Sequence, residues 1–379
     1  MSAFSSLTRP RARYRWRALA ALSAATLLLA ACSSSSSPSS DSSTKANQSG
    51  ASAAPFPVTI TDAAGQKLTF DKPVRKIGCY WSGCDEGLAD LGVTPWASSN
   101  IQGEADSNNK PSTLVYSGGL PKMDTTKLGG EDNPESWAAA GVDLIVTRRP
   151  ASATMNAFKK VAPVLYLYAP GSAPGTDDTS QYHGVAAYEQ NLRLLGAITG
   201  QTEAASQAIK RFDTFVTKLA TKAPTSAATT TVALIFQSND GTYTLYGGPT
   251  LPFCAVLTQY RLGSCADPGG RNAASWQINA EAFLALNPDW IIYMGGQDGA
   301  STDWRKRSDP TWTKLSAVTN KQVLNDFDAR EYCCSLRALA PTLQLYAYTV
   351  WGGASSGVAN PGPVADYRYD DKSSPIAGS

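Results

Sequence analysis

The chain contains a single histidine, His183, among its 379 residues. Structural zinc sites combine cysteine and histidine ligands at short spacings, and no two cysteines of this chain have the C-x-x-C spacing. A Ser-His-Asp or Cys-His catalytic arrangement would have to use this one imidazole, and the chain has neither a His-Glu-x-x-His motif nor a phosphate-binding P-loop. We therefore expect no metal site, no catalytic site and no cofactor, and an enzyme is the weaker hypothesis.

Long apolar runs are scarce as well. After residue 32 no stretch reaches the roughly 18 consecutive apolar residues that a transmembrane helix needs. The apolar run at 18–31 is too short to cross a bilayer, and it follows five arginines with no acidic residue among them: Arg9, Arg11, Arg13, Arg15 and Arg17. A basic segment, a short apolar segment and small residues before a cleavage point together predict a secretory signal.

The signal ends at Leu29-Ala-Ala-Cys32, and a serine tract follows at 33–37. This tetrapeptide resembles a bacterial lipobox, which implies cleavage before Cys32 and diacylation of its sulfur. The alternatives are an ordinary signal peptide with a coincidental cysteine, or an uncleaved anchor. We expect a protein that lipid anchors to the extracytoplasmic face of the cell membrane.

The chain that remains after removal of the signal also lacks an excess of positive charge. Removal of residues 1–31 takes five of the 33 basic residues and none of the 31 acidic ones, so 28 basic residues remain and the net charge falls from +2 to −3. Nucleic-acid binding requires a basic surface on the mature protein. We therefore expect no nucleic-acid partner.

The seven cysteines leave six for other roles if Cys32 carries the lipid. An even number in an oxidising compartment indicates disulfide bonds, although the sequence alone does not give their connectivity. The local candidates are Cys79 with Cys84, Cys254 with Cys265, and the adjacent Cys333 and Cys334. The adjacent pair can close only a strained ring, or each of its cysteines can pair elsewhere.

Two segments of the chain match each other at a constant offset of 146 residues. Glu135–Val146 aligns without a gap with Glu281–Ile292, and each segment predicts a short amphipathic helix, a tight turn and a buried strand. A unit that occurs twice predicts two lobes built on one plan. Between them, apolar residues of 201–222 recur at helical spacing, which predicts a helix of roughly 30 Å that bridges the lobes. A helix within one lobe is the alternative.

The expected domain organisation follows from these patterns and from the composition. The sequence after Gly352 is rich in glycine, serine and proline, which predicts a flexible tail. The expected segments are a signal peptide at 1–31, a Ser/Ala-rich linker at 32–55, an N-terminal lobe at 56–182, a connecting helical segment at 183–224, a C-terminal lobe at 225–352 and the tail at 353–379.

Several short motifs occur in order behind the lipobox. They are Asp85-Glu-Gly-Leu-Ala-Asp-Leu-Gly92, Gly141-Val-Asp-Leu-Ile, Ala162-Pro-Val, Asn287-Pro-Asp-Trp-Ile and Asp309-Pro-Thr-Trp-Thr-Lys-Leu-Ser-Ala-Val318. From Pro57 to Val350 the chain resembles the substrate-binding lipoproteins of ABC importers of the iron–siderophore and vitamin B12 class. The resemblance implies an α/β fold of two Rossmann-like lobes joined by a single long helix, with the ligand cleft between them. A flexible binding protein with two or three crossovers is the alternative architecture.

The resemblance also implies a function. It indicates a receptor that binds a ferric siderophore or a similar iron chelate and delivers it, as a monomer, to the permease and ATPase subunits of an ABC importer. Iron would enter only as part of the chelate, because metal-ion receptors of this fold need several histidines. The alternatives are a receptor for cobalamin or another corrinoid, and a surface lipoprotein that acts as a sensor.

Ligands of α/β lobes lie beyond the carboxyl ends of the strands, and the predicted strands lead into aromatic and arginine residues. Aromatic rings bury a bulky ligand, and arginines donate paired hydrogen bonds to its oxygens. The expected ligand-binding residues are Tyr80, Trp81, Arg148, Arg149, Tyr246, Met294, Trp304, Arg305, Arg330 and Tyr332. Alternatively, the aromatic residues cap the cores of the lobes and the arginines are solvated loop charges. We expect all three cysteine pairs to brace loops at this same edge.

Glu86 stands where the resembling family carries a glutamate on the lobe surface that docks on arginines of the permease. The resemblance therefore implies a docking role for Glu86, and a solvated helix charge is the alternative. The matching glutamate of the second lobe is missing, because Val256-Leu-Thr258 offers a threonine there.

Overall fold

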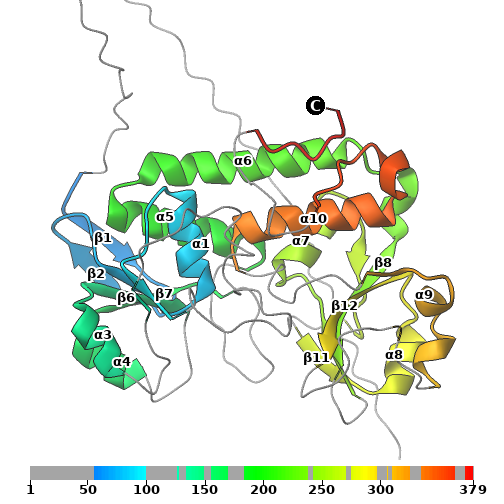
Figure 1. Ribbon diagram of the computed structural model, residues 1–379, viewed down its shortest axis with the longest axis horizontal. Coiled ribbons are helices and arrows are strands. Elements are labelled where there is room, and N and C mark those ends of the chain that lie inside the picture. The colour runs from blue at the N-terminus through cyan, green and yellow to red at the C-terminus, as the bar shows by residue number, and fades with distance from the viewer. Residues whose placement is uncertain are drawn as a thin grey trace, which may run out of the picture. The chain divides into compact units, whose positions relative to one another are not determined.

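The computed structural model describes residues 55–99, 126–127, 134–148, 155–169, 183–237, 242–269, 275–296, 305, 310–324, 334–362 and 372–378. Two separate β-sheets, each flanked by helices, make up most of this part of the chain (Figure 1). None of the described helices is both long enough and apolar enough to cross a bilayer.

The first lobe is built on a five-stranded parallel sheet. A hairpin of β1 (Val58–Thr61) and β2 (Lys67–Phe70) precedes it, as the alternating pattern of these residues predicts. Asp62 in the hairpin turn accepts a hydrogen bond from the backbone N–H of Tyr166 (3.1 Å), which ties the hairpin to the sheet. The strand order is β5 (Thr126–Lys127), β4 (Ala97–Ser98), β3 (Ile77–Cys79), β6 (Leu144–Arg148) and β7 (Val164–Leu167). The helices are α1 (Ser82–Asp90), α3 (Pro134–Ala140) and α4 (Met155–Val161).

The second lobe is built on a mixed sheet. Its parallel strands are β8 (Thr231–Gln237), β12 (Trp290–Gly296) and β13 (Val323–Leu324), with the short β10 (Ser264–Cys265) parallel to the start of β8. β9 (Tyr243–Tyr246) runs antiparallel to both β8 and β11 (Ser275–Ile278). Further elements are α8 (Ala280–Leu286), α9 (Ser316–Thr319), and the 3-10 turns η1 (Thr225–Thr229) and η3 (Trp312–Lys314).

The internal repeat of the sequence appears as the same structural unit in both lobes. α3 leads into β6 as α8 leads into β12, and both helices and both strands begin 146 residues apart. In the turns, Asp143 accepts a hydrogen bond from the N–H of Lys76 (3.3 Å), and Asp289 accepts one from the N–H of Thr231 (2.7 Å). Each repeated aspartate thus fastens the start of its own strand to the neighbouring parallel strand. The prediction of two lobes on one plan is confirmed.

A layer of helices joins the two lobes. It contains α5 (Val185–Thr199), α6 (Thr202–Ala220), α7 (Pro252–Gln259) and α10 (Leu336–Val350). The predicted bridging helix is α6, which lies along α5 at one end and α10 at the other (Figure 1). Gly200, with φ +77°, ends α5. The buried face of α6 consists of Ala205, Ala208, Phe212, Phe215, Val216 and Leu219, which are residues of the predicted apolar face.

One hydrophobic core runs through this helical layer and reaches both sheets. It includes Val146 of the first sheet, Phe212 of α6 and Leu234 of the second sheet. A separate cluster around Trp137 fills the outer face of the first sheet, and another around Phe283 fills the outer face of the second. Because the two lobes share a continuous core, a wide rotation of one against the other would require the helices to repack.

The described parts of the predicted flexible tail carry regular contacts instead. The 3-10 turn η4 (Gly353–Ser356) follows α10, and Val358 is buried and forms a β-bridge with Ile376. Gln344 of α10 donates a hydrogen bond to the carbonyl of Ala359 (2.9 Å). The composition of this segment indicated flexibility, but burial of Val358 against the core fixes residues 353–362, so the prediction is wrong for these residues.

Candidate functional site

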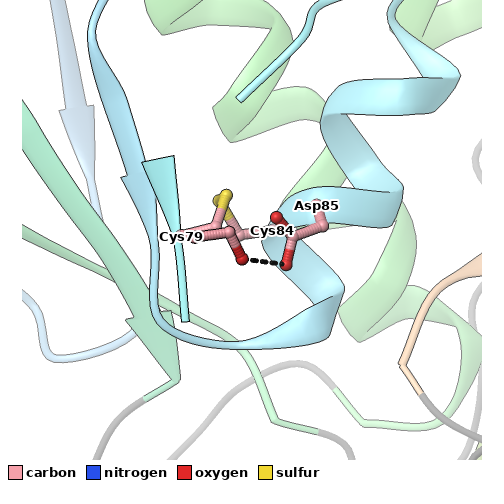
Figure 2. The surroundings of a disulfide bond; sticks show 4 residues. Cys79, Cys84 and Asp85 are labelled. Atoms are coloured by element: carbon pink, nitrogen blue, oxygen red, sulfur yellow. Dashed lines mark hydrogen bonds between the residues drawn. A yellow bond between two sulfur atoms is a disulfide. The ribbon is translucent and has the colours of Figure 1, made fainter. Parts of the chain in front are cut away.

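The carboxyl edge of the first sheet is held by a disulfide. Cys79 ends β3, and the next residue, Tyr80, still donates its N–H to Val146 of β6 (2.9 Å). The chain then turns directly into α1, where Cys84 forms a disulfide with Cys79 at a Cα–Cα distance of 5.5 Å (Figure 2). This predicted pair is confirmed. The bridge fixes residues 80–83 between the end of a strand and the first turn of a helix.

The predicted ligand residues of this lobe differ in what they contact. The half-buried ring of Tyr80 packs against Trp137 (5.7 Å between centroids) and Phe158 (5.1 Å) in the outer core. Trp81 is buried, with its ring against Gly83. Arg148, at the end of β6, is exposed. Of these three residues, Arg148 is the exposed one, and the ring contacts of Tyr80 match the alternative that aromatic residues cap a core.

In the second lobe, Tyr246 was predicted at the edge where the strands have their carboxyl ends, and this location is wrong. β9 runs antiparallel to β8, so Tyr246 pairs with Leu234 in the middle of β8, while Tyr243 pairs with Gln237 at its carboxyl end. The carboxyl end of β9 therefore points away from the edge at which the parallel strands β8, β12 and β13 end. Five residues separate β8 from β9, which is too short for a parallel crossover, and Asp240-Gly241 within them is a hairpin signal that the sequence offered.

Two other predicted residues of the second lobe are described. Met294 lies in the carboxyl-terminal half of β12 and is buried in the shared core beside other apolar side chains. Arg305 is exposed. Arg149, Trp304, Arg330 and Tyr332 lie outside the described residues, as do Cys32 and Cys333.

The cysteine pairs do not all lie at one edge. Cys254 and Cys265 form the predicted disulfide, with a Cα–Cα distance of 5.4 Å. Cys265, however, pairs with Val232 near the amino end of β8. This bridge ties α7 to β10 on the side away from the carboxyl ends of the parallel strands, so the expected bracing of the ligand edge is wrong for it. Cys334 is disulfide-bonded, and a bond to the adjacent Cys333 stays a prediction.

Glu86 is not a surface residue, which corrects the exposure expected of a docking glutamate. Its relative exposure is 2%, and Ser335 Oγ, at the N-terminus of α10, donates a hydrogen bond to its Oε2. Burial raises the pKa of Glu86 well above the usual value of a glutamic acid, and the nearby carboxylates of Asp85 and Asp90 raise it further. A buried carboxyl group of this kind cannot offer its charge to arginines of another protein.

The neighbouring acids of α1 are buried as well. Ser98 Oγ of β4 donates a hydrogen bond to Asp85 Oδ2 (3.2 Å; Figure 2). Asp90 forms ion pairs with Arg337 of α10 (3.0 Å) and Arg211 of α6 (3.5 Å). Burial raises the pKa of Asp90 even though both guanidinium groups act to lower it. Sequence reasoning did not find this cluster, because its members are up to 247 residues apart.

Hollows in the described part of the chain include two that border α5. One, of about 370 Å³, lies between β1 and α5 and includes Tyr168 and Arg193 in its lining. The other, of about 230 Å³, lies between α5, α6 and α7 and includes His183, Glu189 and Asp213. Their described lining residues include none of the predicted ligand residues.

One further motif concerns the enzyme hypothesis. Gly353-Ala-Ser-Ser-Gly357 has the Gly-x-Ser-x-Gly spacing of a nucleophile elbow, which requires a sharp turn between a strand and a helix. Here Ser355 lies in η4, a 3-10 turn that follows a helix, and its hydroxyl donates to the carbonyl of Gly352 (2.8 Å). This geometry does not present a nucleophile.

Comparison with known proteins agrees with this architecture. Residues 143–327 match the model of the family described as periplasmic binding protein. The matched region begins in the repeated unit of the first lobe and extends past β13 of the second. A search of curated protein sequences finds no match.

Solved structures share the fold at low sequence identity. SirA of Staphylococcus aureus, complexed with staphyloferrin B, has a TM-score of 0.58 and 18% identity over 77% of this chain and 98% of SirA. FeuA of Bacillus subtilis, complexed with ferri-bacillibactin, has a TM-score of 0.57 and 18% identity over 78% of this chain and 99% of FeuA. The petrobactin-binding protein YclQ of Bacillus subtilis has a TM-score of 0.55 and 15% identity, over 76% and 96% of the two chains. The two-lobed fold predicted from the sequence is confirmed.

Proposed function

We propose that this protein is an extracytoplasmic receptor that binds a ferric siderophore or a similar iron chelate and delivers it to the permease of an ABC importer. The observation that carries the proposal is the likeness, over nearly the full length of SirA, FeuA and YclQ, to proteins whose names or complexes include a siderophore. The helical layer with its continuous core supports a receptor that changes shape little when it binds.

The proposed ligand site lies beyond the carboxyl ends of the parallel strands of both sheets. In the first lobe, the Cys79–Cys84 bridge holds the loop at 80–83, and the exposed Arg148 supplies a cation beside it. Ferric siderophores present anionic oxygens, which a guanidinium binds through charge-assisted hydrogen bonds. A loop that is ordered before binding lowers the entropic cost of the complex.

A fluorescence titration of the mature chain tests the ligand class. The panel contains ferric catecholate, carboxylate and hydroxamate siderophores, each also in its iron-free form, together with cobalamin. Because eight of the nine tryptophans of the sequence follow residue 31, we expect saturable quenching by at least one ferric siderophore and weaker quenching by its iron-free form. No response from any ferric member would contradict the proposal, and a response to cobalamin alone would favour the corrinoid receptor.

Replacement of Arg148 by alanine tests the position of the site. Loss of a hydrogen bond to a charged group costs about 1.5–3 kcal/mol, which corresponds to an affinity about 10- to 100-fold weaker. The matched control is Arg193→Ala, because Arg193 is an exposed arginine on α5 that pairs with Glu189. Equal affinities for the wild type and Arg148→Ala would remove Arg148 from the site.

We also propose that Cys32 anchors the mature protein through lipid, with residues 32–55 as a linker. The support is the lipobox-like sequence at 29–32 behind a basic and an apolar segment. Cys32→Ser should abolish incorporation of labelled palmitate and move the protein from the membrane fraction into the extracytoplasmic fluid. Retention of Cys32→Ser in the membrane fraction would indicate an uncleaved signal as the anchor instead.

A further inference from the structure

The first turn of α10 contacts α1 of the first lobe. Its N-cap residue, Ser335, hydrogen-bonds Glu86 of α1, and the backbone N–H of Cys334 also hydrogen-bonds the Glu86 carboxyl group. A Cβ atom at Gly83 would lie 2.8 Å from the carbonyl oxygen of Cys334, so the backbones of the two lobes approach closely here. The start of α1 and the start of α10 are therefore in close contact at Gly83 and Glu86.

A second contact lies one helical turn further along α1. Asp90 accepts a hydrogen bond from Arg337 Nε (3.0 Å), and Arg211 of the bridging helix α6 approaches the same oxygen (3.5 Å). The Asp90 side chain is almost completely buried, and those of Arg337 and Arg211 are mostly buried. The start of α10 is thus fastened at two points to the first lobe.

The rest of α10 belongs to the second lobe. Tyr346 donates a hydrogen bond to the carbonyl of Leu262 (3.1 Å) and packs edge-on against Phe253 of α7 (5.5 Å). Pro341 lies between these contacts and the first turn. Because proline has no N–H, the carbonyl of Arg337 loses its helical hydrogen-bond partner, and the first turn is attached less firmly to the remainder of the helix.

We propose that the first turn of α10 is an interlobe latch, formed by the Glu86–Ser335 and Asp90–Arg337 contacts, which fixes the relative position of the two lobes. The latch adjoins the ligand edge proposed above, since Trp81, Gly83 and the Cys79–Cys84 bridge stand at the start of the same helix α1. It adds polar contacts between α1 and α10 to the apolar core of the helical layer that joins the lobes.

The latch responds to protonation of Glu86. The charged groups near Glu86 are Asp85 and Asp90 of its own helix, and Arg337 and Arg211, which pair with Asp90. From α5, the apolar Leu192 and Leu195 pack against α1 at Gly87, and β4 contributes Ser98, which binds Asp85. Among these groups both cations pair with Asp90 and neither pairs with Glu86. Burial therefore disfavours the charged form of Glu86.

The direction of the effect follows from linkage. The pKa of Glu86 is raised in the latched structure, so this structure binds a proton more tightly than one in which Glu86 meets water. The stabilisation is complete below the ordinary glutamic acid value of 4.5 and is lost as the pH rises through the raised pKa. A fall in pH therefore closes the latch, and a rise in pH loosens it.

Distance measurements between spin labels test the latch without any ligand, so the result does not depend on the proposed function. Labels are attached through a ketone-bearing amino acid at exposed Lys67 of β2 and exposed Glu281 of α8, which leaves the cysteines untouched. The wild type should give a narrow distance distribution at low pH that broadens and shifts to longer distances as the pH rises. Glu86→Gln keeps a neutral acceptor for the Ser335 hydroxyl, so the distance distribution of this variant should stay narrow at every pH.

The distance distribution of the Ser335→Ala variant should be broad at every pH. Since Ser335 also accepts the N–H of Ala338 as a helix cap (3.1 Å), the matched control is Asn279→Ala, which removes the cap of α8 within the second lobe (2.8 Å). The control should behave as the wild type does. Two results would overturn the proposal even if Ser335→Ala failed to fold. One is a wild-type distance distribution that does not change with pH. The other is a Glu86→Gln distribution that changes with pH in the same way as that of the control Asn279→Ala.

Discussion

Asp90→Asn is expected to lower the free energy of unfolding by about 3–5 kcal/mol, the cost typical of breaking a buried ion pair by removing one partner. The substitution preserves the shape of the side chain but leaves the guanidinium groups of Arg337 and Arg211 without their shared counter-charge in a mostly buried position. The intact cluster need not be strongly stabilising, since burial raises the pKa of Asp90 despite the two cations. Urea denaturation followed by circular dichroism measures the effect.

An exposed ion pair of the same chain provides the control for this prediction. Glu189 and Arg193 pair at 2.9 Å on α5, with the arginine side chain 50% exposed. Glu189→Gln should cost about 0.3–0.5 kcal/mol, as is typical of exposed pairs on a helix. Equal losses for Glu189→Gln and Asp90→Asn would show that the Asp90 cluster is accessible to water and does not hold the lobes together.

Trp137→Ala is expected to cost about 3–5 kcal/mol, the range for truncation of a large aromatic side chain in a core. Trp137 is fully buried in the outer core of the first lobe, where its ring contacts both Phe158 (5.0 Å) and Tyr80 (5.7 Å). Because Tyr80 directly follows β3 at the proposed ligand edge, the substitution should also weaken ligand binding. Urea denaturation and the fluorescence titration measure the two effects.

Trp96 is the matched control, since it is 43% exposed. Its indole N–H donates to the carbonyl of Ala140 (2.8 Å), and Lys76 lies over its ring (5.1 Å). Loss of these contacts in Trp96→Ala should cost about 1 kcal/mol and leave ligand affinity unchanged, because Trp96 precedes β4 at the opposite edge of the sheet. A smaller loss of stability for Trp137→Ala than for Trp96→Ala would contradict the described core.

The sequence predicted those parts of the fold that local patterns encode. The helical spacing from Ala205 to Leu219 predicted the buried face of α6, and the offset of 146 residues predicted the repeated helix–strand unit. Cys79 with Cys84 and Cys254 with Cys265 were recognisable as pairs because they are close in sequence. In each case the information lies within one element or one short loop.

The errors arose where distant segments decide the outcome. Glu86 follows another acid on a short helix, a pattern typical of a solvated surface, and only its contact with Ser335, 249 residues away, explains its burial. The position of Tyr246 depends on strand direction, and the expectation treated β9 as parallel. The position of the Cys254–Cys265 bridge depends on the pairing of β10 with the start of β8. Local hydrophobic periodicity contains no information about these tertiary contacts.

Hydrogen–deuterium exchange of the mature chain, with and without the ferric siderophore that binds it, tests whether the ligand lies between the two lobes. The ligand should slow exchange at the carboxyl edges of both sheets, within residues 79–84 and 146–148 of the first lobe and 292–296 of the second. Protection in only one lobe, or protection confined to the amino edges at 142–144 and 230–232, would contradict a receptor that holds its ligand between the two lobes.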